Sequence, residues 1–515
     1  MAVALAVSGA RAAEAQGAPT AGRFAASAYL ALHHWAYDYL DLLIARGRLP
    51  SLPQLVRPYR RADLALALLA AERSGRLGAT EGRWVEDLKH ELDAEIALVE
   101  GRREPEVTFG REFAVGLKGL SQRHRDLLRP EGKSALFPIW GLALRGEAPG
   151  VAGGFQLRWD GHYLNDPQFP GGRVIEFREC DPFVAECAYR IDDAYVEIQT
   201  RYVRLFLGRM PRNWGLAGTH GFLVSSYAYT YDHIGYSFGT SRLSLRGVFA
   251  PLSDMGGDTA RYFSSHRFDW QIRDNLGLSA SESVVYGGVN RRIDLALTNP
   301  VNIWEISAAR GDLETERNTL GLLELWWRPW KGVVTYGGFL VDNTAVGSPA
   351  SPSIPQWGAH LGLQMPSLRP TLALRADLSI LNSLVYRSSH GLLEHYTVQG
   401  LSLGRDLTDA VVASVEGDWF VRPGLIVKPQ VRLAWRGQDD LRLPWPPDGY
   451  GHDPLLVGTT ETTIRPAVAG RWRFPYGDVE WDAGLNLIKN QDNVVQGWNA
   501  KFVGRVQAVW RTRFP

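Results

Sequence analysis

A large transmembrane antiparallel β-barrel with a small N-terminal α-helical domain is the fold class that the sequence predicts. Three observations predict it. From residue 105 to residue 515, apolar and polar residues alternate with a period of two, as on strands whose successive side chains point to opposite faces. The chain carries 18 Trp, 19 Tyr and 54 Gly, which suits aromatic girdles and tight turns. It has no run of about 18 apolar residues, so no helical membrane span is expected.

The last strand shows this alternation most clearly. Even positions from Phe502 to Phe514 are mostly apolar and include Trp510, whereas the odd positions include Arg505 and Arg511. The segment is long enough for a tilted transmembrane strand, which needs roughly 9–11 residues. Taken alone, it could also be an amphipathic edge strand of a soluble sheet.

The rest of the alternating region favours the barrel. Six further segments repeat the pattern: residues 155–160, 195–202, 242–249, 267–273, 425–436 and 479–487. Their polar faces are rich in Arg and poor in Lys, which suits guanidinium–carboxylate pairs lining a water-filled lumen. Roughly 410 residues at about 20–25 per strand and turn predict some 16–20 strands.

The N-terminal part has a different organisation. Residues 1–16 combine a short apolar run with small-residue sites, which is typical of a removed secretory leader, although a basic start is missing. Residues 23–104 then predict a helical domain. Leu40 and Leu43 lie on a helical stripe that Gly47 would end, and two more helices are expected within 57–77 and 81–101. This domain could be a cap that plugs one end of the barrel.

Several other functions are not expected. A formal charge of +1 provides no basic field for nucleic acid. The sequence shows no metal, nucleotide or redox motif, so neither a cofactor nor a metal is predicted. Ser264 and His266 would share a strand face without an evident third catalytic partner, and we therefore do not predict an enzyme. Cys180 and Cys187 could form a loop disulfide or remain two unpaired thiols.

Two blocks of the sequence resemble the Wzi-type capsule assembly family of outer-membrane barrels. The first block carries the match at Gly208, Arg209, Asn213, Trp214, Gly215, Leu223, Ser225, Ser226 and Asp232. The second carries it at His266, Arg267, Glu282, Tyr286, Gly287, Asn299 and Pro300. The N-terminal helical segment is similar both to the helical region of that family and to surface-layer homology modules, which bind cell-wall polymers. This second likeness makes peptidoglycan a further candidate partner.

The family resemblance implies a barrel of about 18 strands with a periplasmic helical domain, in the outer membrane of a Gram-negative (diderm) bacterium. It implies outer-membrane lipid and surface or capsular polysaccharide as partners, because known members act as lectins for capsule. A general or substrate-specific porin is the alternative, since a wide polar barrel conducts unless it is plugged.

The candidate ligand-binding residues are aromatics of expected extracellular loops, whose flat faces could stack on sugars. They are Trp214, Tyr227, Tyr229, Tyr231, Trp445 and Tyr450, with His452 beside them. Arginines could pair with uronic acid carboxylates. Each aromatic could instead be a girdle or loop-packing residue. A second group is expected to serve the family motif or to line the lumen, with Arg209 and Glu282 as a structural pair there. The group is Arg209, Asn213, Gly215, Asp232, His266, Arg267 and Glu282.

Overall fold

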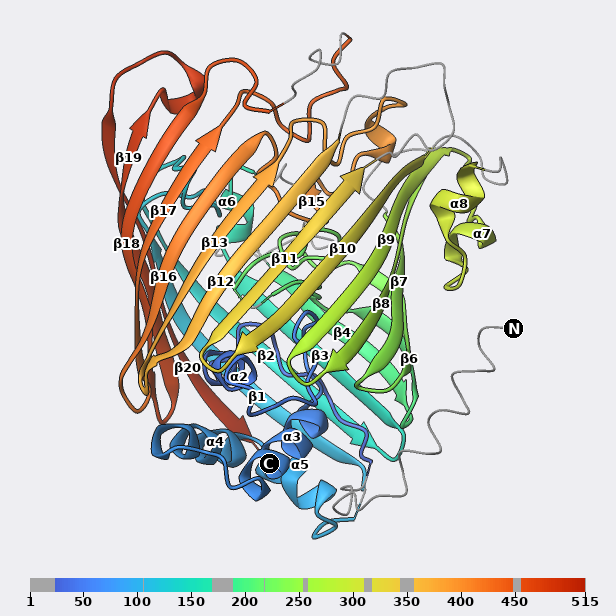
Figure 1. The fold of residues 1–515 in the computed structure, drawn as a ribbon, viewed down its shortest axis with the longest axis vertical. Helices are drawn as coiled ribbons and strands as arrows, with labels where there is room; N and C mark the ends of the chain where they lie inside the picture. Colours follow the sequence, from blue (N-terminus) through green and yellow to red (C-terminus); the bar gives the residue numbers. More distant parts are fainter. Residues whose placement is uncertain are drawn as a thin grey trace, which may run out of the picture.

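The structure is a closed antiparallel barrel (Figure 1). The computed structural model describes residues 24–104, 106–168, 189–216, 218–252, 258–309, 317–342, 356–447 and 455–514. Within these residues, 18 strands form one sheet, and the last strand pairs with the first over Arg111–Leu120 and Arg505–Phe514. The expected strand number and the closing role of the C-terminal strand are therefore confirmed. The predicted leader, Cys180, Cys187, Tyr450 and His452 lie outside the described residues.

Each strand pairs with its neighbours in chain order. The first nine strands are β1 (Thr108–Leu120), β2 (Ala135–Ala148), β3 (Val151–Asp160), β4 (Tyr189–Gln199), β5 (Val203–Arg209), β6 (Asp232–Gly239), β7 (Leu243–Pro251), β8 (Thr259–Arg273) and β9 (Leu276–Val289). The other nine are β10 (Arg317–Trp330), β11 (Val333–Asp342), β12 (Trp357–Arg369), β13 (Leu372–Leu381), β16 (Ala410–Arg422), β17 (Leu425–Arg436), β18 (Glu461–Phe474), β19 (Gly477–Lys489) and β20 (Asn499–Phe514). A separate two-stranded sheet contains β14 (Thr397–Val398) and β15 (Leu401–Ser402).

Short turns connect the strands at one end of the barrel, and long connections join them at the other. We call these the short-turn end and the long-loop end. The short turns include Gly424, which adopts a φ of +76° between β16 and β17 and so favours glycine. The long connections contain the remaining short helices: α6 (His162–Asn165), α7 (Leu295–Thr298), α8 (Trp304–Ala309), η1 (Leu392–Glu394) and η2 (Gln491–Asn493).

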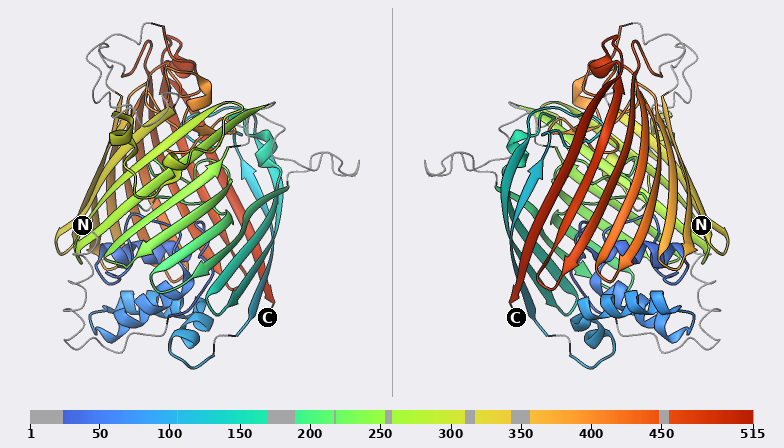
Figure 2. Two further views of the ribbon diagram at one scale, coloured as in Figure 1. Left: turned by 90° about the vertical axis from the view of Figure 1, so that its right-hand side faces the viewer. Right: turned by 90° about the vertical axis from the view of Figure 1, so that its left-hand side faces the viewer.

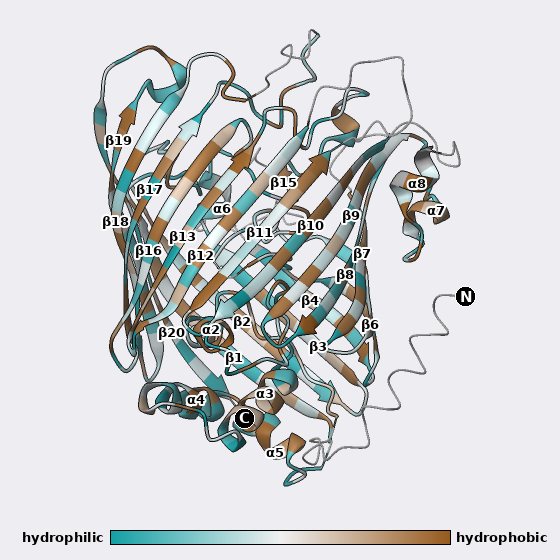
Figure 3. Ribbon diagram, viewed as in Figure 1, coloured by the Kyte–Doolittle hydropathy of each residue, from teal (hydrophilic) through white to brown (hydrophobic). Residues whose placement is uncertain are grey.

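The outer face of the barrel is apolar. Figure 3 shows hydrophobic and hydrophilic residues alternating along the strands. Exposed tryptophans gather near the short-turn ends of their strands: Trp270, Trp327, Trp330, Trp419, Trp472 and Trp510. Phe339 and Phe502 are exposed near the other ends, and Phe339 stacks on Trp357. An apolar band between two aromatic girdles is characteristic of a transmembrane barrel, and the predicted fold class is confirmed.

The N-terminal helices lie at the short-turn end (Figure 1). They are α2 (Ala36–Ala45), α3 (Arg61–Arg73), α4 (Ala79–Glu91) and α5 (Asp93–Val99). Gly47, with a φ of +72°, follows the end of α2 as expected. The third predicted helix is interrupted at Leu92, where φ is −109° and ψ is 23°, so it forms α4 and α5. No described helix is both long and apolar enough to cross a membrane.

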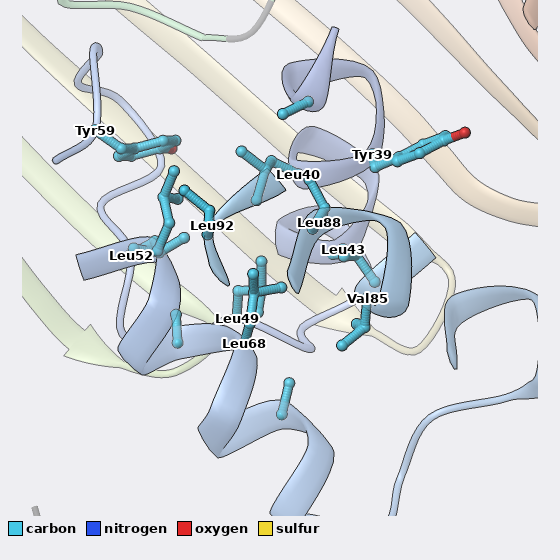
Figure 4. Close-up of a cluster of buried hydrophobic side chains, with 14 of the residues drawn as sticks. Tyr39, Leu40, Leu43, Leu49, Leu52, Tyr59, Leu68, Val85, Leu88 and Leu92 are labelled. Carbon is cyan, nitrogen blue, oxygen red and sulfur yellow. The ribbon is translucent and has the colours of Figure 1, made fainter. Parts of the chain in front are cut away.

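These helices share one hydrophobic core with the barrel wall. Figure 4 shows Leu40, Leu43, Leu68 and Leu88 converging in it. Ala373, Phe420 and Ile426 of the strands belong to the same cluster. We call residues 24–104 the helical cap.

Ion pairs around the rim hold the cap to the barrel. Asp38 of α2 contacts Lys428 Nζ at 3.0 Å and Arg471 Nη1 at 2.5 Å, and Glu91 of α4 contacts Arg513 Nη1 at 2.9 Å. The cap therefore occupies the short-turn end of the barrel, through both apolar packing and charge pairing.

Candidate functional site

The long-loop end of the barrel is filled by its own connections. Four of them fold inward, and we call their described residues the loop layer: 121–134, 210–216 with 218–231, 382–409 and 437–447. Phe222, Leu223, Tyr386, Tyr396 and Leu441 of this layer form one buried apolar cluster with inward-facing wall residues. The wall contributes Val248, Ala250, Phe263, Val285, Leu320, Leu322, Leu340 and Leu381. An apolar cluster inside the lumen stabilises the inward path of the loops.

Two stacked tyrosines hold the 210–231 connection in place. The rings of Tyr386 and Tyr396 lie 5.3 Å apart at 17°. Their hydroxyls donate to the backbone oxygens of Phe222 at 2.6 Å and Leu223 at 2.8 Å. The backbone nitrogen of Tyr386 donates to Asp342 of β11 at 2.6 Å. A continuous set of hydrogen bonds therefore runs from the wall to the centre of the lumen.

Trp214 lies inside this layer and is only 2% exposed. The expectation of a loop aromatic open to solvent is wrong for this residue, because its connection folds into the barrel. The neighbouring backbone is also tightly packed: a Cβ on Gly215 would meet Gly221 at 2.8 Å. Asn213 accepts from the Gly221 backbone nitrogen at 2.9 Å, and its backbone pairs with Arg57 of the helical cap. Asn213 and Gly215 thus shape the turn inside the lumen.

Asp406 connects four loops at one carboxylate. Oδ2 accepts from Arg129 Nη2 at 2.5 Å and from Gln168 Nε2 at 2.5 Å, and Oδ1 accepts from Arg442 Nη2 at 2.6 Å. Its side chain is 2% exposed. Burial alone would raise the pKa of Asp406, but the two guanidinium groups outweigh it and hold the pKa well below its usual range. The carboxylate is therefore a charged junction of the loop layer.

Of the predicted tyrosines, Tyr227 lies beside this junction, where its hydroxyl accepts from Arg129 Nη2 at 3.3 Å. Tyr227 and Tyr229 are partly buried, and the guanidinium of Arg125 lies 5.3 Å and 4.4 Å from their ring centroids. Arg190 lies 4.4 Å from the Tyr229 centroid as well. Tyr231 packs edge-on against Phe263 of the wall. These rings are packed against the protein itself, which is the alternative that the sequence left open.

Trp445 is the predicted aromatic of the 437–447 connection, and its exposure is intermediate, as is that of the three tyrosines. It is partly exposed and follows Leu443 and Pro444, which are both exposed. Its connection rests on the fully buried guanidinium of Arg387, which bonds to Asp439 and to the Pro444 backbone oxygen. Trp445 therefore stands on a rigid, hydrogen-bonded base.

Arg442 lies three residues before this tryptophan in the same connection. Its side chain is 28% exposed, and it is held by Asp406, by Asp440 at 2.6 Å and by the Gly400 backbone oxygen at 2.9 Å. An oriented, partly exposed guanidinium can pair with carboxylates, and a neighbouring indole can stack on a sugar face. The surface around Arg442 and Trp445 is the candidate functional site.

The prediction that Arg209 and Glu282 form an ion pair in the lumen is wrong. Arg209 instead forms a two-pronged pair with Asp232, at 2.9 Å and 2.5 Å, across β5 and β6. Both residues continue the outward-facing rows that contain Leu207 and Ile234. The alternation itself carried this information, because a residue two positions from an outward leucine shares its face.

His266 and Glu282 also face outward. His266 Nε2 lies 3.3 Å from Glu282 Oε2, and both side chains are shielded by the β9–β10 connection. Arg267 faces the lumen as expected, where it is fully buried and bonds to Asp269 at 2.7 Å and to Glu324. The prediction placed every polar motif residue in the lumen. Phe268 and Trp270 share the strand face of His266, however, and these exposed aromatics show that the face points outward.

The same geometry bears on the serine considered for catalysis. Ser264 shares the outward face with His266. Glu282 is the acidic third partner that was not evident in the sequence. Among the described residues, the buried Ser264 hydroxyl has no hydrogen-bond partner. A nucleophile–base hydrogen bond is therefore not formed in this conformation. The absence of enzymatic activity stays a prediction.

Sequence reasoning did not single out Asp406, Arg129, Arg387 or Arg442. They come from three separate connections. Loop sequences have no periodicity from which the pairing of charged residues could be predicted.

A cavity of about 290 Å³ lies between the helical cap and the barrel wall. Tyr59, Arg60, Arg204 and Asp269 are among the residues that line it. It is separate from the loop layer.

Comparison with known proteins gives a likeness at the level of fold. No family model matches the chain, and no curated protein matches its sequence. Among solved structures, Wzi, an outer-membrane protein involved in group 1 capsule assembly in Escherichia coli and a carbohydrate-binding β-barrel, is similar with a TM-score of 0.63 at 13% identity. The match covers 95% of this chain and 99% of that one. The chain therefore has a Wzi-like fold.

Two Pseudomonas aeruginosa proteins are more distant. OccD3 (OpdP) has a TM-score of 0.45 at 11% identity and covers 82% of this chain and 98% of its own. OccK11 (OpdR) has a TM-score of 0.43 at 11% identity and covers 79% of this chain and 96% of its own.

Proposed function

We propose that the protein is an outer-membrane barrel that binds surface polysaccharide at its long-loop end. In this orientation the helical cap lies in the periplasm and the loop layer faces the outside. The observation that carries the proposal is the loop layer, which presents Arg442 and Trp445 on a rigid support. Likeness to a carbohydrate-binding barrel over nearly the whole chain agrees with it.

The chemistry favours an acidic polysaccharide. Arg442 commits Nε to Gly400, Nη1 to Asp440 and one Nη2 hydrogen to Asp406, which leaves the second Nη2 hydrogen to donate to a uronic acid carboxylate. Trp445 offers a flat apolar face for a pyranose ring. Retention of such a polymer at the cell surface would be the cellular role, as in capsule assembly.

The alternative, a general or substrate-specific porin, agrees less well with the described residues. The apolar cluster and the tyrosine hydrogen bonds cross the interior at the long-loop end, and the helical cap occupies the other end. A porin keeps a water-filled channel between its two mouths. Stable open-channel currents of the purified protein in planar bilayers would favour the porin.

Binding of purified, detergent-solubilised protein to immobilised acidic and neutral polysaccharides tests the proposal. Trp445→Ala should weaken binding by at least about 1 kcal/mol, roughly fivefold, because an aromatic contact is lost. Trp498→Ala is the matched control, since Trp498 is 56% exposed and lies outside the loop layer. Arg442→Lys keeps the charge but loses the guanidinium that Asp406 and Asp440 orient, and should weaken only the acidic polymer.

Equal binding by the Trp445 and Trp498 variants would contradict the proposed site. Unchanged capsule or slime attachment after deletion of the gene would contradict the cellular role.

Peptidoglycan contact by the helical cap remains a separate proposal. The buried faces of the four helices pack against one another and the barrel, so only their outer surfaces could contact a cell-wall polymer. Co-sedimentation of the intact protein with purified peptidoglycan sacculi tests it.

A further inference from the structure

One long connection takes the opposite path from the loop layer. Residues 290–309, between β9 and β10, fold down over the outside of the barrel, and we call them the flap. Figures 1 and 2 show α7 and α8 beside the outer wall. Leu297 and Trp304 of the flap are each 1% exposed and form a buried cluster with Val284 and Tyr286 of β9. The flap is therefore packed onto the wall and is part of the fold.

The wall beneath the flap is unusually polar for an outer face. The register places Ser264, Val284 and Thr319 in one row across β8, β9 and β10, and His266 and Glu282 in the next row. Ser264 is 2%, Thr319 5% and Glu282 8% exposed. If these groups faced hydrocarbon directly, the desolvation of a carboxylate, an imidazole and two hydroxyls would cost free energy.

The flap makes specific polar contacts with this part of the wall. The Trp304 backbone nitrogen donates to Glu282 Oε2 at 2.8 Å, and the Trp304 ring lies 4.3 Å from the His266 ring. The Asp294 backbone nitrogen donates to the Tyr286 hydroxyl at 3.2 Å. Within the flap, Ala296 O accepts from the Trp304 indole nitrogen at 3.1 Å. These bonds satisfy polar groups that a lipid environment would leave without partners.

The exposed side of the flap is mostly apolar, and among the described side chains Asn290, Arg292 and Asn299 are its exposed polar residues. Five large aliphatic side chains point away from the wall: Ile293, Leu295, Val301, Ile303 and Ile306. Leu295 is 78% and Val301 77% exposed, more than Leu323 of the neighbouring bare wall at 66%. The flap thus replaces a polar patch of the wall with an apolar surface that continues the barrel's outer band.

The height of the flap follows from the strand register. His266 lies four residues above Trp270 of the lower girdle on β8, and Tyr262, which also contacts the flap cluster, lies eight residues above it. At about 3.3 Å per residue and a tilt of about 40°, these positions are roughly 10 Å and 20 Å above the girdle. The apolar band of such barrels is about 25 Å tall. The flap therefore covers the half of the band that is nearer the long-loop end.

We propose that the flap is a lipid-binding element whose aliphatic surface contacts the acyl chains of the outer leaflet. It seals the His266–Glu282 patch from hydrocarbon by presenting apolar side chains in its place. The inference rests on the outer-membrane location proposed above and is independent of which glycan is bound. Continuity with the apolar band, at the same height, favours lipid over a second copy of the chain as the occupant.

Depth-dependent quenching in lipid vesicles tests the inference on the full chain. In a background with Cys180→Ser and Cys187→Ser, single cysteines replace Leu295 or Val301 and carry an environment-sensitive fluorophore. Leu323→Cys on the bare wall is the lipid-facing control, and Val495→Cys, 81% exposed in the β19–β20 loop, is the water-facing control. The vesicles contain phosphatidylcholine brominated along its acyl chains.

We expect the two flap positions to be quenched as strongly as position 323, and position 495 to be unaffected. If fluorescence is quenched at position 323 but not at the flap positions or at 495, this inference is overturned and the membrane location stands. Loss of quenching at 323 as well would remove both. Disulfide cross-linking between unlabelled Leu295→Cys copies, at high lipid-to-protein ratio, would make a second copy the occupant and would also overturn it.

Discussion

Neutralising Asp406 should open the loop layer while the barrel stays folded. Asp406→Asn preserves the side-chain shape but removes the charge that Arg129 and Arg442 share. Breaking one partner of a buried ion pair costs about 3–5 kcal/mol. Each arginine keeps a second carboxylate, Asp126 at 3.0 Å and Asp440 at 2.6 Å, so the lower value applies. About 3 kcal/mol corresponds to a roughly 100-fold larger population of the open loop layer.

Hydrogen–deuterium exchange with peptide resolution measures this directly. Amides in 121–134, 210–231 and 382–409 that exchange through opening of the layer should exchange roughly 100-fold faster, because exchange follows the open population. Strand amides should not change. Asp440→Asn is the matched control: its carboxylate contacts the same arginine, but at 32% exposure it should contribute at most about 1 kcal/mol. Equal exchange in the two variants would refute the central role of Asp406, and a parallel loss of thermal stability would refute the local effect.

Three further predictions concern other parts of the chain. Burial lowers the pKa of His395 to about 4, so its neutral form stabilises the loop layer above pH ~6.5. Up to about 3 kcal/mol of the stability of the layer is lost as the pH falls toward 4. His395→Gln should therefore flatten the pH dependence of hydrogen–deuterium exchange in the loops. Asp38→Asn should leave Lys428 and Arg471 without their helical partner and raise protease sensitivity of the helical cap, and unchanged cleavage would contradict its rim contacts. Trp304→Ala removes the side chain that is buried against the wall, so it should reduce lipid quenching at the flap cysteines, and full quenching would contradict its anchoring role.

Much of the barrel could be predicted because its information is local. Residues such as Phe502, Val506 and Trp510 repeat at even spacing, and this repeat alone identifies a strand and its outward-facing side. The helical stripe through Leu40 and Leu43 and the stop at Gly47 are equally local. Chain length divided by strand and turn length predicted some 16–20 strands, a range that includes the 18 observed.

The candidate site could not be predicted in the same way. Trp214 and Trp445 both belong to aromatic-rich connections, yet Trp214 is buried in the lumen and Trp445 is partly exposed. The difference depends on whether the connection finds an apolar partner inside the barrel, such as the Tyr386–Tyr396 stack, and that partner is more than 150 residues away along the chain.

By itself, the sequence determined the barrel, its outward-facing apolar rows and the existence of a helical N-terminal region, because alternation and helical period act over a few neighbouring residues. Only the tertiary structure decided that Arg209 meets Asp232, that Asp406 joins four loops, and that one connection covers the outer wall. Those contacts depend on strand register and on the path of each loop, and neither leaves a periodic signal in the residues that make the contact.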